Sequence, residues 1–197
     1  GLGLVLWAGS GAAQDQQQRS GAGKQMAQTA GQQGKVANEL ALGDRQAIAM
    51  ADLAMQRSNS QQVTDYAKRV KAAHQANLQA LQGWASGKKA EIASIAILVP
   101  KQGTGGSGGL TDQQKQQVKD QAKQYGKDFQ SKVEDAQNQV NELAQTSSDD
   151  FDKKFLSMTT DLQNQQIDTA KNAQQKFSSD ATFTAVMGST QNSFNRL

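Results

Sequence analysis

Residues 63–81, VTDYAKRVKAAHQANLQAL, decide the fold class of this chain. Their apolar and small side chains recur at steps of three and four residues, the spacing that gathers side chains on one face of an α-helix. That face comprises Val63, Tyr66, Ala67, Val70, His74, Asn77, Leu78 and Leu81. Asn59 and Ser60, just before the stretch, are typical of a helix break followed by an N-cap. The stretch therefore predicts an amphipathic helix that packs against other helices.

Helical spacing also predicts the elements on either side. A first helix is expected from Asn38 to about Ser58, and its short connection to the next helix predicts an antiparallel hairpin. Residues 112–145 carry apolar side chains at alternating steps of three and four, which predicts one continuous helix about 50 Å long. Two more helices are expected, after the breaks at 147–150 and 178–180.

Three shorter stretches carry local signals. Thr111 and Gln114 form a capping-box sequence at the start of the long helix. The apolar run 92–99 ends at Pro100 and fits either a buried helix or an extended chain. Residues 102–109, QGTGGSGG, have the composition of a flexible linker. We expect five helices in total and no sheet.

Composition supports an all-α protein and excludes several kinds of site. The 197 residues include one proline, which favours long helices, and no cysteine, which excludes disulfides, thiolate zinc sites and cysteine nucleophiles. The net charge of +3 is spread along the chain, whereas nucleic-acid-binding proteins usually cluster their basic residues. We therefore expect no nucleic-acid partner.

The N-terminal residues predict export. The apolar run 2–7 is followed by small residues up to Ala13, typical of the end of a signal peptide cleaved after Ala12 or Ala13. The run is far too short to span a membrane, so no transmembrane helix is expected in the mature chain. Residues 14–37, rich in Gln and Gly, predict a disordered leader, and 38–197 the helical bundle. A periplasmic or secreted location follows.

Two stretches resemble the bacterial domain of unknown function 4142. The first is the Ala-Asp-Leu-Ala at 51–54 followed by 60–78, similar to that family's serine break and its helix with an aromatic-Ala pair and a His-x-x-Asn step. The second is 151–158, FDKKFLSM, similar to the start of the family's third core helix. The resemblance implies a ferritin-like four-helix bundle, here with an extra or elongated helix, and an envelope location. The family's further His positions correspond to Leu162 and Phe194, and its acidic positions to Ala47 and Ala49.

His74 is the one histidine and the weak candidate for a metal ligand or proton-transfer group. Ferritin-like metal sites require Glu-x-x-His motifs, and Lys71 stands three residues before His74. A buried core histidine, hydrogen-bonded to Asn77 or to a facing side chain, is therefore the favoured interpretation. No metal, cofactor or catalytic residue is expected.

Four lysines recur every four residues along the predicted long helix, at 115, 119, 123 and 127. Lys115, Lys119, Lys123 and Lys127 could contact an anionic surface, but Asp112, Asp120 and Asp128 lie nearby. A solvated face is the favoured interpretation.

These patterns predict a non-enzymatic envelope protein that acts as an interaction or stress-related module, with a protein or envelope component as partner. Two alternatives remain open. One is a degenerate ferritin-like metal binder centred on His74, and the other is a structural protein that self-associates through the helix predicted at 112–145.

Overall fold

The computed structural model describes residues 11–100 and 110–197, with side chains described from residue 28 onward. These residues form six helices and no strand, which confirms the prediction of an all-α protein. The helices are α1 (Gly11–Arg57), α2 (Gln61–Gly87), α3 (Asp112–Lys123), α4 (Lys127–Gln145), α5 (Ser148–Lys176) and α6 (Ala181–Phe194). The residues 1–10 of the predicted signal remnant and the glycine-rich linker lie outside the described residues.

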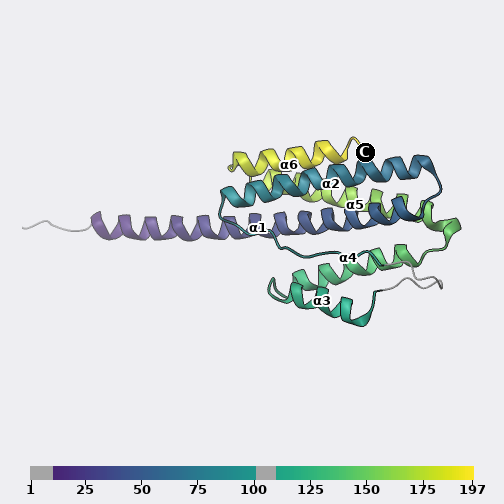
Figure 1. Cartoon of the computed structure of the whole chain (residues 1–197). Coiled ribbons are helices and arrows are strands. Elements are labelled where there is room, and N and C mark those ends of the chain that lie inside the picture. Colours follow the sequence, from purple (N-terminus) through teal and green to yellow (C-terminus); the bar gives the residue numbers. More distant parts are fainter. Residues whose placement is uncertain (1–10, 101–109) are drawn as a thin grey trace, which may run out of the picture.

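Helix α1 is the centre of the packing. It contacts α2 and α5 on one side and α4 on another, while α6 contacts both α2 and α5 (Figure 1). Two apolar clusters lie along α1. One joins α1 to α2, α4 and α5 and contains Met50, Leu53, Phe151 and Phe155, and the other joins α1 to α2, α5 and α6 and contains Leu40 and Phe183. Helix α3 pairs with α4 beneath α1 (Figure 1).

Helix α1 starts much earlier than the sequence predicted. It is continuous from Gly11, and its first part extends beyond the other helices (Figure 1), where a disordered leader was expected over 14–37. Gln33 and Ala37 are buried, and Gln33 Nε2 donates to Asp180 Oδ2 at 3.2 Å, so the packed region begins before residue 38. Alanine and glutamine favour helix, and extending a packed helix costs less than nucleating a new one.

The single long helix predicted over 112–145 is wrong. The chain turns at Gly126, whose φ is +91°, and returns as α4 alongside α3. This turn brings the two halves of the apolar seam into one cluster with Leu42 of α1. The cluster contains Leu42, Ala93, Ile95, Val118, Ala122, Val133 and Ala136. Because this turn buries the seam within the chain, no continuous helix over 112–145 presents it to a second copy.

The apolar run before Pro100 is extended chain, one of the two alternatives that the sequence left open. Ala93 and Ile95 are buried in the cluster just described. Gln137 of α4 fixes the backbone of Leu98, since its Oε1 accepts from Leu98 N and its Nε2 donates to Leu98 O, both at 2.8 Å. The amide side chain of Gln137 thereby takes the place of a neighbouring strand.

Side chains at the helix ends explain where the helices begin. The predicted capping box of Thr111 and Gln114 is present, and Ser60 and Ser147 each accept from a backbone amide in the first turn of α2 and α5. Asp180 does the same for α6 and also binds Lys88 Nζ at 2.8 Å. The predicted breaks at these positions are confirmed.

Arg57, the last residue of α1, closes the turn between α4 and α5. Its guanidinium donates to the carbonyl oxygens of Leu143, Ala144 and Thr146 at 3.2, 2.7 and 2.7 Å. It also lies over the ring of Phe151, 4.4 Å from the centroid. One cation therefore binds three carbonyl oxygens at and just beyond the C-terminal end of α4.

None of the described helices is both long enough and apolar enough to cross a membrane.

The turn at Gly126 predicts opposite effects for two glycine substitutions. Gly126→Ala should lower the free energy of unfolding by about 1–2 kcal/mol, because a side chain is strained at its positive φ. Gly83→Ala in α2, where an added Cβ meets nothing within 4 Å, should raise it by up to about 1 kcal/mol. Urea unfolding measures both. Equal effects of the two changes would contradict the role assigned to the turn.

Candidate functional site

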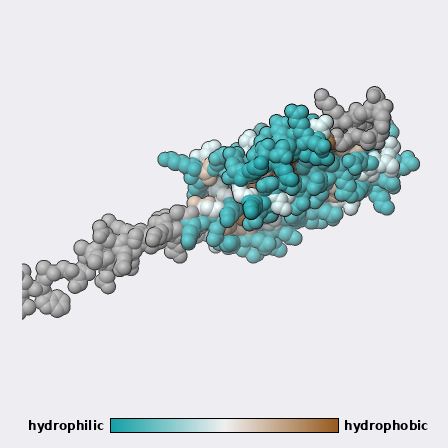
Figure 2. Space-filling model, turned by 90° about the horizontal axis from the view of Figure 1, so that it is seen from below, coloured by the Kyte–Doolittle hydropathy of each residue, from teal (hydrophilic) through white to brown (hydrophobic). Residues whose placement is uncertain are grey.

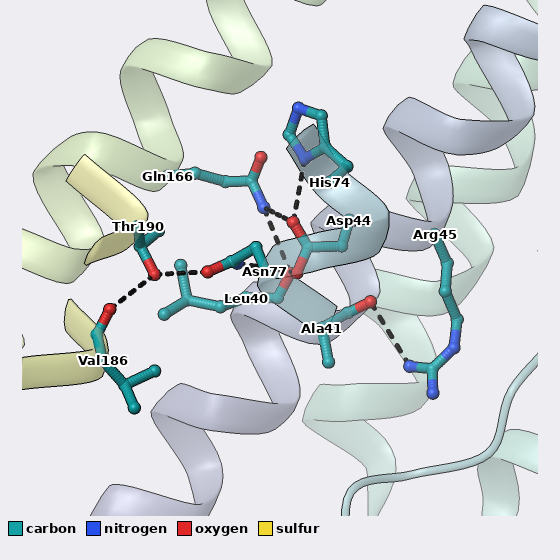
Figure 3. Close-up of polar contacts among 9 residues, drawn as sticks. All are labelled: Leu40, Ala41, Asp44, Arg45, His74, Asn77, Gln166, Val186 and Thr190. Atoms are coloured by element: carbon teal, nitrogen blue, oxygen red, sulfur yellow. Dashed lines mark hydrogen bonds and ion pairs between the residues drawn. The ribbon is translucent and has the colours of Figure 1, made fainter. Parts of the chain in front are cut away.

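A buried aspartate and histidine form the centre of the site. Asp44 lies on α1 and His74 on α2, and both side chains have 0% exposure. His74 Nδ1 lies 2.8 Å from Asp44 Oδ1 (Figure 3). When Asp44 is ionised its carboxylate can only accept hydrogen bonds, so Nδ1 then carries the proton in this contact. The pair links the first two helices at the middle of the bundle.

Amide side chains complete the surroundings of the carboxylate. Asn77 Nδ2 donates to Asp44 Oδ2 at 2.8 Å, and Gln166 Nε2 of α5 donates to Asp44 Oδ1 at 3.2 Å and to Leu40 O at 3.1 Å. Thr190 of α6 donates its hydroxyl to Asn77 Oδ1 (Figure 3). The network therefore includes a side chain from each of α1, α2, α5 and α6. Its members are Asp44, His74, Asn77, Gln166 and Thr190.

Gly43 makes room for the amide of Gln166. A Cβ at position 43 would lie 2.7 Å from Gln166 Nε2 and 3.0 Å from its Cδ. Gln166 is buried and held at both Asp44 and Leu40 O, so its amide has little freedom to retreat. The absence of a side chain at residue 43 is therefore part of the site.

The second nitrogen of His74 is enclosed without a hydrogen-bond partner. The imidazole stacks on Phe194 of α6, with ring centroids 4.3 Å apart and an interplanar angle of 27°. His74 Nε2 and Gln166 Oε1 are both buried and unpartnered. The ring is thus oriented by a carboxylate at Nδ1 while Nε2 has free bonding capacity.

Burial sets the electrostatics of the pair. The loss of hydration raises the pKa of the Asp44 carboxyl above its ordinary value. The hydrogen bond and charge of His74 and the hydrogen bonds from Asn77 and Gln166 act in the opposite direction and offset only part of this effect. The hydrogen-bond donors around Asp44 therefore offset part of the free-energy cost of burying its carboxylate, but not all of it.

The lysines of the predicted stripe do not form a continuous free cationic face. Lys127 begins α4 and lies beyond the turn at Gly126. Each of the other three has a carboxylate within 4 Å: Lys115 with Asp112 at 3.6 Å, Lys119 with Glu134 at 3.6 Å, and Lys123 with Asp120 at 2.5 Å. Mixed exposed charges of this kind are typical of a solvated surface.

Asp44 is the residue that sequence reasoning missed. It lies four residues after Leu40 and three before Ala47, so it occupies the apolar stripe of α1, where a carboxylate is unexpected. An acidic residue on the apolar stripe of one helix, with a histidine on the apolar stripe of the next, is the sequence pattern that indicates such a buried pair. Of the two kinds of partner suggested for His74, the structure has the facing side chain, Asp44, whereas Asn77 donates to Asp44.

No group of three or more His, Cys, Asp or Glu side chains that could hold a metal ion occurs in the described part of the chain. A metal at His74 Nε2 would need oxygen ligands such as the Gln166 amide, whose free Oε1 is buried. His74 alone supplies the nitrogen ligand.

Comparison with known proteins identifies a family but no activity. Residues 35–192 match the family model described as Domain of unknown function (DUF305), a range that contains all five residues of the network. No curated protein and no solved structure matches the chain. The resemblance to domain of unknown function 4142 is not supported by this match, and only the assignment to a domain of unknown function stands.

The contact between Gly43 and Gln166 predicts a non-additive pair of substitutions. Gly43→Ala should destabilise the protein by about 1–3 kcal/mol, because it displaces a donor from a buried carboxylate. In a Gln166→Ala background the same change should cost nothing or stabilise slightly, since the clash is gone and alanine favours helix. A double-mutant cycle measured by chemical unfolding tests this. Additive effects would contradict the proposed contact.

The raised pKa of Asp44 predicts a pH-dependent difference between the wild type and Asp44→Asn. The unfolded carboxyl ionises near its ordinary value of 3.8 and the folded one at higher pH. The contribution of Asp44 to the free energy of unfolding is therefore complete below the pKa of the carboxyl in the unfolded chain. It falls as the pH rises through the pKa in the folded chain, by at most about 1.4 kcal/mol per pH unit. Unfolding free energies across acidic to neutral pH measure it. A wild type that gains stability relative to the variant over that range would contradict the direction.

Proposed function

The chain belongs to the DUF305 family, a domain of unknown function, and we propose that it acts as a non-enzymatic helical interaction module in the bacterial envelope. The observation that carries the proposal is the enclosure of the Asp44–His74 pair, since both side chains have 0% exposure. A substrate would have to separate packed helices to reach either group. The pair is better suited to holding the helices in register than to a reaction.

The arrangement of donors supports a structural role. A catalytic base needs a partner that leaves it free to take a proton, whereas Asp44 accepts from three side chains that lie on two other helices. A buried polar network whose members bond one another favours one packing over others, because any slip of a helix leaves a buried charge unpaired. The network thus provides a rigid scaffold.

The outer surface supports action by contact with other molecules. The face in Figure 2 is mostly hydrophilic, with small hydrophobic areas between polar side chains. Glutamine and lysine side chains are exposed along α3 and α5. Such a surface is compatible with a polar envelope component as partner and with a stress-related role.

The location is proposed from the sequence alone. The apolar run at 2–7 and the small residues after it are the reason for proposing export to the periplasm or beyond. We also propose that α1, α2, α5 and α6 form a ferritin-like four-helix bundle, on the basis of their mutual contacts.

A metal-binding function is the second candidate, and one observation favours it. A histidine that ligates a metal commonly donates its other nitrogen to a carboxylate. His74 has that orientation, with Nδ1 at Asp44 and Nε2 unpartnered. The metal would be held at Nε2, which is buried beneath Phe194.

His74→Asn separates the two candidates, because asparagine can still donate to Asp44 but lacks the imidazole. In the bacterium that carries the gene, the variant should be recovered from the envelope fraction and should restore growth under envelope stress to a strain lacking the protein. Circular dichroism must first show that the variant is folded. A folded variant that fails to restore growth, together with zinc or copper binding by the wild type alone, would favour the metal binder. Recovery of the wild type with an uncleaved N-terminus in the cytoplasmic fraction would contradict export.

A further inference from the structure

Arg45 is a half-buried cation with most of its hydrogen-bonding capacity free. It follows Asp44 in α1, but its side chain points away from the Asp44–His74 network (Figure 3). Its Nη1 donates to Ala41 O at 3.3 Å, and no carboxylate pairs with it among the described residues. Burial lowers the pKa of this guanidinium, and the neighbouring Asp44 charge opposes that effect. A guanidinium carries five N–H donors in a fork that suits a carboxylate.

Arg45 lies at a groove between α1 and the extended segment 94–99. The groove has a volume of about 350 Å³, within the range of small-molecule sites. Its lining includes three branched aliphatic side chains, Ile48 from α1 and Ile97 and Val99 from the segment, all half-buried. Ile48 lines the groove without belonging to a core cluster, whereas Ile97 and Val99 also pack against the core.

Gln121 of α3 adds an unsatisfied acceptor to the same groove. Its Oε1 is buried and has no hydrogen-bond partner. Arg45 and Gln121 both line this groove, so α3 contributes to its lining beside α1 and the extended segment. A ligand here would donate a hydrogen bond to Gln121 Oε1 and, through a neighbouring group, accept hydrogen bonds from Arg45.

The two charged side chains that line the groove, Arg45 and Asp52, have opposite signs. Asp52 lies at the other end, seven residues along α1 and thus about 10 Å from Arg45. Its Oδ1 is paired with Lys71 Nζ at 2.6 Å, which reduces its repulsion of an anion. The groove therefore suits a ligand without net charge that carries an anionic group, a donor and an aliphatic part.

We infer that this groove binds a free aliphatic α-amino acid. The carboxylate takes the free donors of Arg45, the ammonium donates to Gln121 Oε1, and the branched side chain lies against Ile48, Ile97 and Val99. The inference is independent of the proposed envelope function, because it rests on residues that do not belong to the Asp44–His74 network.

Titration calorimetry of the full chain with L-leucine tests the site. We expect one leucine per chain, weaker binding of isocaproate, which lacks the amino group, and no binding of isopentylamine, which lacks the carboxylate. Arg45→Gln should weaken leucine binding by about tenfold or more, because a charge-assisted contact is lost. Lys153→Gln removes the same charge from an exposed position outside the groove and should leave binding unchanged.

Gln121→Ala gives a second, independent readout. It should reduce the preference for leucine over isocaproate while isocaproate binds as before. This variant also tests the proposed leucine site if Arg45→Gln does not fold. The inference is overturned if native protein shows no saturable leucine binding, if both variants bind leucine like the wild type, or if isopentylamine binds as tightly as leucine.

Discussion

The burial of one carboxylate constrains how α1, α2, α5 and α6 pack. Asp44 has no access to water, so every hydrogen bond that it loses on folding must be replaced by the protein. The replacements come from α2 and α5, and α6 is tied in through Thr190 and Asn77. Sliding one helix along another by a turn would break this set, whereas aliphatic contacts would tolerate the slide. The polar centre therefore specifies the packing, and the apolar clusters around it supply most of the favourable free energy.

Local signals in the sequence were sufficient for helix type and helix starts. The stripe from Val63 to Leu81 and the caps at Ser60, Thr111, Ser147 and Asp180 identified elements that the structure contains, because caps and periodicity act within a few residues. The turn at Gly126 was missed since the heptad-like spacing continues across it in sequence. Only the tertiary gain of packing both halves against Leu42 and Ile95 distinguishes a hairpin from a straight helix.

The candidate site was only partly accessible to sequence reasoning. His74 was assigned to the buried face from its spacing to Val70 and Leu81, and it is buried. Its partner Asp44 lies 30 residues earlier, and Gln166 lies 122 residues after Asp44, so neither contact leaves a local pattern. The groove beside Arg45 was equally hidden, because it depends on how the extended segment after α2 lies along α1. A single sequence does not show which polar side chains pair over long distances along the chain.

The position of Arg57 has a consequence for the order in which the chain can fold. Its three carbonyl acceptors lie 86 to 89 residues further along the chain, at the end of α4. During synthesis, the hairpin of α1 and α2 emerges from the ribosome well before these acceptors exist. Until then the guanidinium of Arg57, at the end of α1, lacks these acceptors. The native topology is therefore completed only after the C-terminal half has been made.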